Sequence, residues 1–264
     1  DSTTTIARAD ASYLITGGLG GLGLNIQSWL ANKGAKHIIL TSRSKMNKIA
    51  EELITRIIKQ GVKVEVVQAD ISEYKDAKQV MSRCTNIKGV IHAAGIIEDG
   101  LLSTQSKGSF ARVMAAKVDG TWHLHNLTKE LDLDYFVCFS SVASLLGSAG
   151  QSNYAAANAF MDQFSHYRHT IGLPCVSINW GPWSEAGMAT SLKDRLHSQG
   201  YKTLTTANGL EIMEKIISSY KSPQVAVLPM NWKVFLARFN KSLPFFNQLK
   251  IENSVKGDNV PLID

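Results

Sequence analysis

Four polar side chains in the middle of the chain could together donate protons and hydrogen bonds to a ligand. Ser141 ends an apolar run that is typical of a buried strand. Tyr154 follows it by 13 residues, and Asn158 lies one helical turn later, on the same face of an expected helix. Lys117 belongs to an earlier expected helix that should pack nearby. A phenol and a hydroxyl at one point can stabilise charge that develops on an oxygen, and a nearby cation lowers the phenol pKa.

A glycine-rich segment near the start of the chain is typical of a phosphate-binding turn. Five of the seven residues 17–23 are glycine, and they join an expected strand, 13–16, to an expected helix, 22–33. Such a turn directs backbone N–H groups and the positive end of the helix to one point, which a pyrophosphate can approach closely. The alternative is a tight turn without a ligand. We predict that a dinucleotide binds along Thr16, Gly17, Gly18, Leu19, Gly20, Gly21 and Leu22.

The end of the second expected strand indicates which dinucleotide would bind. A carboxylate there would hold the ribose 2′-hydroxyl of NAD, but this chain has Ser42, Arg43 and Ser44. A guanidinium flanked by hydroxyls suits a 2′-phosphate, which predicts NADPH. The alternative is that Arg43 is a solvated surface charge. Asp70, followed by Ile71, closes the third strand and could meet the adenine, or it could only cap a helix.

The spacing of apolar residues predicts short strands that alternate with amphipathic helices. This order predicts an α/β fold: a Rossmann-like, doubly wound, parallel seven-stranded sheet with right-handed crossovers and helices on both faces. We expect one catalytic domain over residues 1–240 and a polar, loosely held tail or linker over 241–264. The expected strands are 13–16, 37–41, 62–68, 89–93, 135–140, 175–180 and 224–228, and the expected helices are 22–33, 49–59, 72–83, 109–131, 152–170 and 207–220.

Composition excludes several classes of protein. The chain has 264 residues, of which 44% are hydrophobic, so it is not intrinsically disordered. The formal net charge of +6 suits an acidic or phosphorylated partner, but the charge is scattered, which argues against nucleic-acid binding. No apolar run approaches the roughly 20 residues of a membrane span, so we expect a cytoplasmic protein without a membrane partner.

The three cysteines form neither a disulfide framework nor a metal pattern. Cys84, Cys138 and Cys175 are an odd number at wide spacing, and no metal site is expected. Cys138 and Cys175 lie in apolar runs, where free cysteine packs as a small hydrophobic residue. This usage fits a reducing compartment.

Taken together, the motifs resemble a known family over residues 13–228. They are similar to those of the short-chain dehydrogenases/reductases, and specifically to the ketoreductase domains of polyketide synthases and animal-type fatty acid synthases. Free-standing members usually carry Lys four residues after the Tyr and Asn on the preceding helix; here Asn158 and Lys117 are exchanged, as in the multi-enzyme synthases. The motifs are the glycine turn, His92-Ala93-Ala94-Gly95, Ser140-Ser141, and the segments 116–122, 150–158 and 179–183.

The resemblance implies NADPH-dependent reduction of a β-ketoacyl chain that phosphopantetheine tethers to an acyl carrier protein. Hydride from the nicotinamide would reach a ketone carbon, Tyr154 would donate the proton and Ser141 a second hydrogen bond. Lys117 would lower the phenol pKa, and Asn158 would order water or Lys117 for proton resupply. It also implies further cofactor contacts at Ala93, Ala94, Gly95, Pro182 and Trp183, and substrate contacts at Asp99, Gln151 and Met188.

The resemblance also bears on the lid and on the product configuration. Trp183, Met188 and Leu192 are expected in a mobile lid, or alternatively in ordinary packing. Members that form the D-hydroxy (B-type) product carry Leu-Asp-Asp where this chain has residues 97–99, Ile-Glu-Asp, which keeps the final Asp. The opposite outcome goes with a Trp shortly before the Tyr, and residues 150–153 contain none. The sequence therefore favours B-type; alternatively, Glu98 and Asp99 only cap the following loop.

The family also suggests partners and alternatives. Family members usually carry an upstream structural subdomain, so we expect this chain to be the catalytic half of a longer domain, with that subdomain, the carrier protein and other synthase domains as partners. The alternatives are a redox-inactive or epimerising NADPH-binding scaffold, a free-standing short-chain ketone reductase and a nucleic-acid module. The complete set of four polar residues argues against an inactive scaffold, and the exchange of Lys117 and Asn158 argues against a free-standing reductase. The absence of a basic stripe argues against a nucleic-acid module.

Overall fold

The computed structural model describes residues 5–184, 193–219, 221–239 and 244–246. Within these residues the strands form a seven-stranded sheet in the order β3-β2-β1-β4-β5-β6-β7, and every neighbouring pair is parallel. This confirms the predicted fold class. The strands are β1 Ser12–Thr16, β2 His37–Ser42, β3 Lys63–Gln68, β4 Ile87–His92, β5 Tyr135–Ser141, β6 Val176–Trp180 and β7 Gln224–Val227.

The central strands are buried on both faces because their sequences are nearly continuous apolar runs. All five residues of β1 and all five of β6 are buried. Alternate residues of β1 pack into two separate cores, since side chains point to opposite faces of a strand. Tyr13 and Ile15 belong to one core and Leu14 to the other.

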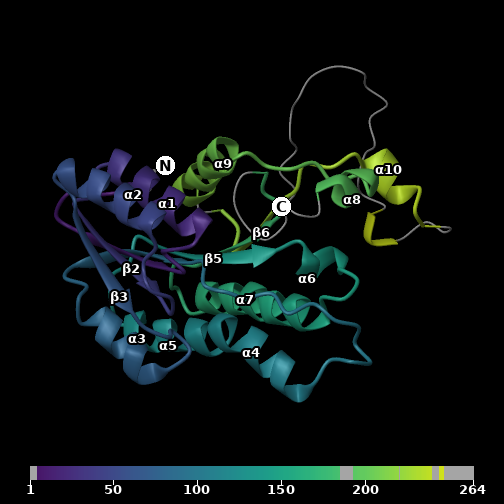
Figure 1. Ribbon diagram of the computed structural model, residues 1–264, viewed down its shortest axis with the longest axis horizontal. Helices are drawn as coiled ribbons and strands as arrows, with labels where there is room; N and C mark the ends of the chain where they lie inside the picture. Colours follow the sequence, from purple (N-terminus) through teal and green to yellow (C-terminus); the bar gives the residue numbers. More distant parts are fainter. Residues whose placement is uncertain (1–4, 185–192, 220, 240–243, 247–264) are drawn as a thin grey trace.

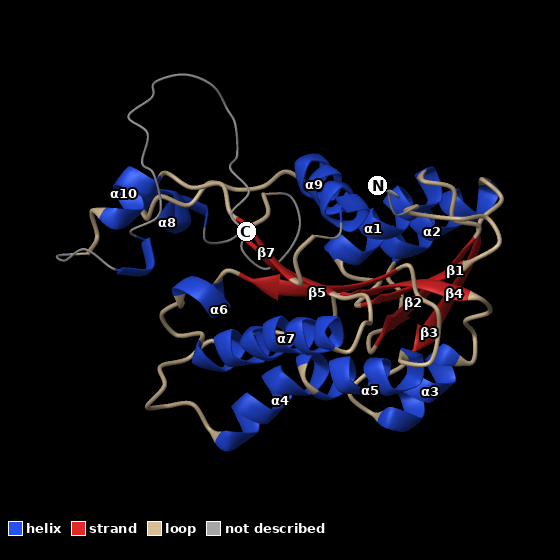
Figure 2. Ribbon diagram, turned by 180° about the vertical axis from the view of Figure 1, so that it is seen from behind, coloured by secondary structure: helices blue, strands red, loops and turns tan. Residues whose placement is uncertain are grey.

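Helices cover both faces of the sheet (Figures 1 and 2). Three helices pack on one face: α1 Gly21–Asn32, α2 Lys48–Lys59 and α9 Thr206–Ser219. Four pack on the other: α3 Tyr74–Met81, α4 Lys107–Lys117, α5 Asp119–Thr128 and α7 Ser152–Thr170. None of the described helices is both long and apolar enough to span a membrane.

The prediction of one long helix over 109–131 is wrong, because two helices meet there at Val118. Val118 has φ −96° and ψ −66°, and it separates α4 from α5. Two backbone carbonyls at this point have partners outside the helical ladder. Ala116 O lies 3.0 Å from His92 Nε2, and Lys117 O accepts from the Thr121 hydroxyl at 2.6 Å. The break thus lies beside a contact with the end of β4, which periodicity alone does not reveal.

Short elements beyond the carboxyl ends of the strands were not predicted. They are α6 Ala143–Leu146, α8 Lys193–Ser198, α10 Trp232–Leu236 and a 3₁₀ turn, Pro244–Phe246. In that turn, the Phe246 ring lies 6.0 Å from Trp232 and 5.7 Å from Phe235, measured between centroids. Phe246, in the segment expected to be a loose polar tail, therefore contacts α10 through its ring, while Phe245 is exposed.

Candidate active site

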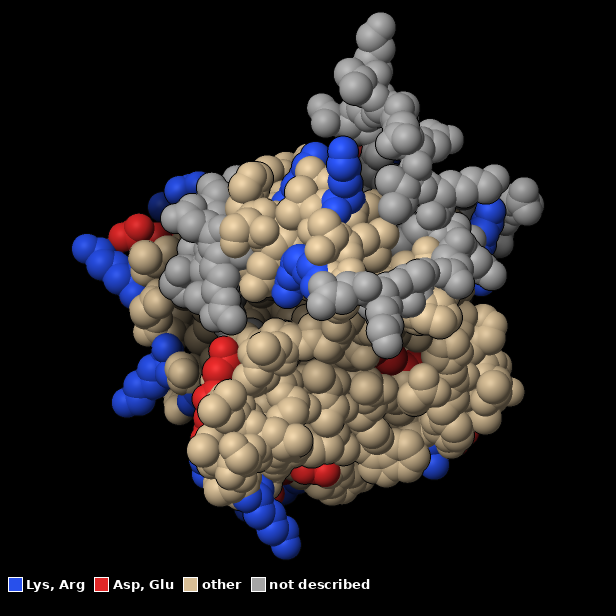
Figure 3. All heavy atoms as spheres, turned by 90° about the vertical axis from the view of Figure 1, so that its right-hand side faces the viewer, with Lys and Arg blue, Asp and Glu red and all other residues tan. Residues whose placement is uncertain are grey.

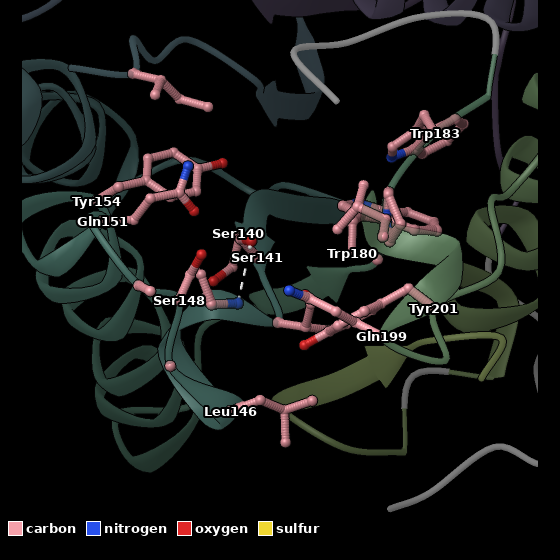
Figure 4. A pocket seen from close by; sticks show the side chains of 18 of the residues that line it. Ser140, Ser141, Leu146, Ser148, Gln151, Tyr154, Trp180, Trp183, Gln199 and Tyr201 are labelled. Atoms are coloured by element: carbon pink, nitrogen blue, oxygen red, sulfur yellow. Dashed lines mark hydrogen bonds between the residues drawn. The ribbon is translucent and has the colours of Figure 1, made fainter. Parts of the chain in front are cut away.

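A cavity of about 540 Å³ lies at the carboxyl end of the sheet. Figure 4 shows Tyr154 and Gln151 on one side of it, Trp180, Trp183 and Tyr201 on the other, and Ser141 between them. The cavity opens beside the point where the strand order reverses, between β1 and β4, which is where open α/β sheets bind ligands. Lys117, Ser141 and Tyr154 all line it, so the structure brings these three predicted residues together.

Lys117 is a buried cation beside the Tyr154 ring. Its side chain is 3% exposed, and Nζ lies 5.5 Å from the ring centroid and donates to the Phe139 carbonyl at 2.9 Å. Burial lowers its pKa to about 8, while the nearby Cys138 and Asp162 oppose that fall. The absence of a side chain at Gly95 makes room for Lys117, because a Cβ there would lie 2.8 Å from Lys117 Cε.

The Tyr154 phenol differs from the prediction. Its pKa is raised, first because the side chain is buried, and the Asp99 charge adds to the effect. Hydrogen bonds with Asn158 and Ser141 act in the opposite direction but do not outweigh burial. The expected lowering by Lys117 is therefore not found in the protein alone, where the ammonium group donates to a backbone carbonyl instead.

Ser141 and Asn158 each keep a polar atom for a ligand or a water. Ser141 Oγ accepts from the Ala143 backbone N–H at 3.2 Å, which leaves its hydroxyl hydrogen to donate. Asn158 is fully buried, and its Nδ2 donates to the Tyr154 carbonyl at 2.7 Å. Its Oδ1 is buried without a hydrogen-bond partner among the described residues, and buried polar atoms normally have one.

The glycine turn is explained partly by packing within the protein. Gly17 has φ +68°, and a Cβ there would lie 2.9 Å from Ala93 O, so the turn can approach the end of β4 only with glycine. Gly18 and Gly23 are similarly crowded. The amino end of α1 follows at Gly20, with no side-chain cap and no acidic residue in the first turn. Backbone N–H groups and the positive helix end therefore remain for an anion.

Two residues predicted to bind the cofactor have structural roles. Thr16 is fully buried; its Oγ1 lies 2.6 Å from His92 Nδ1 and accepts from Ala94 N at 3.2 Å, which joins β1 to the end of β4. The pKa of His92 falls to about 3 because of burial, so the ring is neutral. Ile71 is 4% exposed and packs in a core cluster, so only its backbone remains for a ligand.

The residues expected to read the adenosine end lie on the surface after β2 and β3. The Arg43 side chain is 55% exposed, with Nη1 at 3.8 Å from Asp70 Oδ2. Ser42 Oγ accepts from Ser44 N at 3.2 Å. Asp70 accepts from both the backbone and the hydroxyl of Ser72 in a local turn, whereas the residue that precedes α3 is Glu73, so Asp70 is not the helix cap that was the alternative.

The expected lid residues divide into two groups. Trp183 is 5% exposed; its ring centroid lies 4.9 Å from that of Trp180, and its indole covers Gly209. Trp183 therefore packs in the core, as the alternative had it, although it also borders the cavity, as does Pro182. Met188 and Leu192 lie outside the described residues.

The two acidic side chains of segment 97–99 have different partners. Asp99 lines the cavity, and its Oδ1 accepts from Gln151 Nε2 at 3.0 Å. Glu98 instead forms two hydrogen bonds with Arg112, of 3.0 and 2.6 Å, which lower the pKa of the carboxyl. Asp99 thus joins two neighbouring loops at the cavity wall, and neither acidic group serves as a simple loop cap.

Several lining residues were missed because no motif marks them. The far wall of the cavity includes Leu196, Tyr201, Phe235, Arg238 and Phe239, which come from α8, α10 and their flanking loops. The cluster of aromatic residues after position 230 was the available signal.

The described residues contain no group of three or more side chains that could hold a metal ion. On the face drawn in Figure 3, basic side chains are dispersed rather than gathered into a stripe.

The fold and the site are those expected of a nicotinamide-binding α/β reductase, and the comparisons with known proteins identify the family. The KR domain family model matches residues 11–185. Polyketide synthase GfsA of Streptomyces halstedii is 36% identical over 88% of this chain. One of the phenolphthiocerol/phthiocerol polyketide synthase proteins of Mycobacterium tuberculosis is 35% identical over 96%. A solved A1-type ketoreductase superposes with a TM-score of 0.86 at 31% identity, covering 94% of this chain and 55% of that one.

The chain belongs to the ketoreductase (KR) domain family of the polyketide synthases. Members of this family are oxidoreductases that bind a nicotinamide cofactor. The chain spans 3% of the length of GfsA and 14% of the mycobacterial synthase protein, which are multidomain proteins. Lys117, Ser141, Tyr154 and Asn158 are therefore found in a domain whose relatives work beside other domains.

Proposed function

We propose that this domain uses NADPH to reduce a β-ketoacyl chain, held as a thioester on an acyl carrier protein, to the β-hydroxyacyl product. One observation carries the proposal: Lys117, Ser141 and Tyr154, from three distant segments, line one cavity beside the glycine turn. Their groups are a cation, a hydroxyl and a phenol, which suit an oxygen that gains negative charge.

The residues present fit a nicotinamide dinucleotide. The glycine turn and the uncapped start of α1 offer backbone N–H groups to a pyrophosphate. Leu22, Ala93, Gly95 and Pro182 border the same cavity as Tyr154, so they would hold the nicotinamide end. When bound, the cofactor supplies the hydride.

The chain's own residues supply the proton and position the ketone. Tyr154 donates its phenolic proton to the carbonyl oxygen, and its raised pKa keeps that proton in place until charge develops. Ser141 donates a second hydrogen bond to the same oxygen. Lys117 stabilises the phenolate that remains, and Asn158 Oδ1 accepts from a water or from Lys117 on the route by which the proton returns.

Two finer features belong to the same proposal. Arg43, which lies exposed after β2 with no carboxylate in its place at the strand end, favours NADPH over NADH through the 2′-phosphate. The final Asp of segment 97–99 and the lack of a Trp in residues 150–153 favour the D-hydroxy (B-type) outcome, and Asp99 borders the cavity in contact with Gln151. Solved relatives include A-type ketoreductases, so product configuration is the discriminating measurement.

The test is incubation of the protein with NADPH and a panel of β-ketoacyl thioesters, including carrier-bound ones. We expect NADPH consumption, a lower KM for the carrier-bound chains, and a D-hydroxy product by chiral chromatography. The Tyr154→Phe variant should bind NADPH but not consume it. Binding of NADPH without reduction of any thioester by the unmodified protein would overturn the proposal, and exchange at the α-carbon without consumption would indicate an epimerising role.

A further inference from the structure

A carboxylate is buried behind the active site, and every described contact is arranged to donate to it. Asp162, on α7, is 3% exposed. Its Oδ1 accepts from the Ser177 hydroxyl at 2.6 Å, and its Oδ2 lies 2.7 Å from Ser144 Oγ and 2.8 Å from Asn179 Nδ2. A carboxylate is costly to bury and is retained where its hydrogen bonds are satisfied, so this group calls for a reason.

The partners of Asp162 also hold the end of β5. Asn179 is fully buried, and its Nδ2 lies 3.3 Å from the Ser141 carbonyl and 3.1 Å from Ser140 Oγ. Ser144 Oγ lies 2.8 Å from the same Ser141 carbonyl. The backbone of Ser141 is therefore held by the two side chains that also contact Asp162.

Counting hydrogens explains why a carboxylate, and not another polar group, suits this place. Asn179 Nδ2 carries two hydrogens and Ser144 carries one, and all three lie among acceptors: the Ser140 and Ser144 hydroxyls, the Ser141 carbonyl and Asp162 Oδ2. The far side of the Asn179 amide is fixed, because Oδ1 accepts from Gln224 Nε2 at 3.0 Å. An amide at position 162 would present a donor or leave a hydrogen without an acceptor.

We propose that Asp162 is a positioning residue of this active site: through Asn179 and Ser144 it orients the Ser140–Ser141 end of β5, and so places the Ser141 hydroxyl against the ketone oxygen. The inference rests on the proposed function. Asp162 itself does not line the cavity, so it does not touch the substrate; its charge also reaches Lys117, whose pKa it raises. A displacement of a hydrogen-bond donor by a fraction of an ångström is enough to slow catalysis, because the donor must lie where the charge develops.

The first test is Asp162→Asn, which keeps the shape of the side chain and replaces one of its two acceptor oxygens by an NH2 donor. We expect kcat to fall roughly 10- to 100-fold, with the NADPH dissociation constant unchanged within about twofold. Assays near pH 6.5 keep Lys117 protonated, since its pKa is about 8. The matched control is Ser165→Ala, on the same helix: Ser165 is also fully buried and its hydroxyl donates to Pro223 O at 2.5 Å, away from Ser141. The control should keep kcat within about twofold.

The second test distinguishes positioning from a general loss of stability. If Asp162 acts through Ser141, then Asp162→Asn should lower kcat by less than about threefold in a Ser141→Ala background. An equal loss in both backgrounds, or an equal loss in the Ser165→Ala control, would overturn the inference. Ser144→Ala removes one of the two side chains that connect Asp162 to Ser141, at a partly exposed position. If Asp162→Asn does not fold, the kcat of the Ser144 variant is compared in the same two backgrounds.

The outcomes also separate this inference from the proposed function. If the unmodified protein reduces no β-ketoacyl thioester, the proposed function fails, and the role of Asp162 in it fails with it. If the unmodified protein is active and Asp162→Asn retains full kcat, only the positioning role fails. A fall in kcat that depends on the Ser141 hydroxyl supports both.

Discussion

The inner and outer parts of the active site are built differently. In the inner part, Lys117 and Asn158 are 3% and 0% exposed and are held by contacts from several strands and helices. In the outer part, Asp99 is exposed and accepts from Gln151, while Arg43 is 55% exposed and pairs loosely with Asp70. Burial strengthens charge interactions and fixes geometry, whereas exposed contacts are screened by water. We therefore expect inner residues to control rate and outer residues to control selectivity.

The largest effect should come from the inner phenol. Tyr154→Phe removes the proposed proton donor, and kcat should fall by at least about 100-fold, which is the usual contribution of a positioned acid. The NADPH dissociation constant should stay within about twofold, because no binding group is lost. Steady-state NADPH consumption and a fluorescence titration measure the two quantities. Unchanged turnover would remove Tyr154 from the chemistry.

Lys117→Met should separate rate from stability in the same inner region. Burial lowers the Lys117 pKa from its ordinary value of 10.5 to about 8, so the protonated side chain destabilises the folded state below pH 8. The Met variant should therefore be more stable at pH 7, by up to about 2 kcal/mol after the lost bond to Phe139 is allowed for, while its kcat falls at least about 10-fold.

The sign of the pH dependence provides a check on Lys117. As pH rises from 8 toward 10.5, the folded protein releases the Lys117 proton before the unfolded chain does, so the stability of the unmodified protein gains on that of the Met variant. Chemical denaturation at pH 7 and pH 10 measures the difference. A stability difference that does not shrink at the higher pH would contradict the buried-charge explanation.

In the outer region, Arg43→Ala should change cofactor choice. We expect NADPH binding to weaken by about 1–3 kcal/mol, the range for a hydrogen bond to a charged group, and NADH binding to change little. Dissociation constants for both cofactors give the comparison. Equal losses for NADPH and NADH would show that Arg43 does not contact the 2′-phosphate.

The smallest effect on rate should come from Asp99→Ala, which removes the contact with Gln151. Turnover should change by less than about threefold, while the stereochemical purity of the product declines, as measured by chiral chromatography. Glu98→Ala is the matched control, since it breaks the pair with Arg112 one residue away and should leave purity unchanged. Equal purity for the Asp99 variant and the unmodified protein would remove Asp99 from stereocontrol.

Local patterns predicted most of the fold because helices and strands depend mainly on near neighbours. The helix expected over 152–170 is α7, Ser152–Thr170, and the seven strands were all placed. The break at Val118 was not predicted, and the contact beside it, between His92 and the Ala116 carbonyl, joins residues that are distant in sequence. The contacts of the Thr16 hydroxyl with His92 and Ala94 also depend on a distant segment, and cofactor binding at Thr16 stays a prediction.

The sequence by itself determined the alternation of strands and helices, the glycine turn and the identity of the four candidate catalytic groups, because each is a matter of residue type and spacing. Only the tertiary structure decided that Lys117 donates to Phe139, that burial raises the Tyr154 pKa, and that Asp162 lies behind Ser141. The burial of a group and its hydrogen-bond partners depend on which distant segments come into contact, and only the folding of the whole chain determines those contacts.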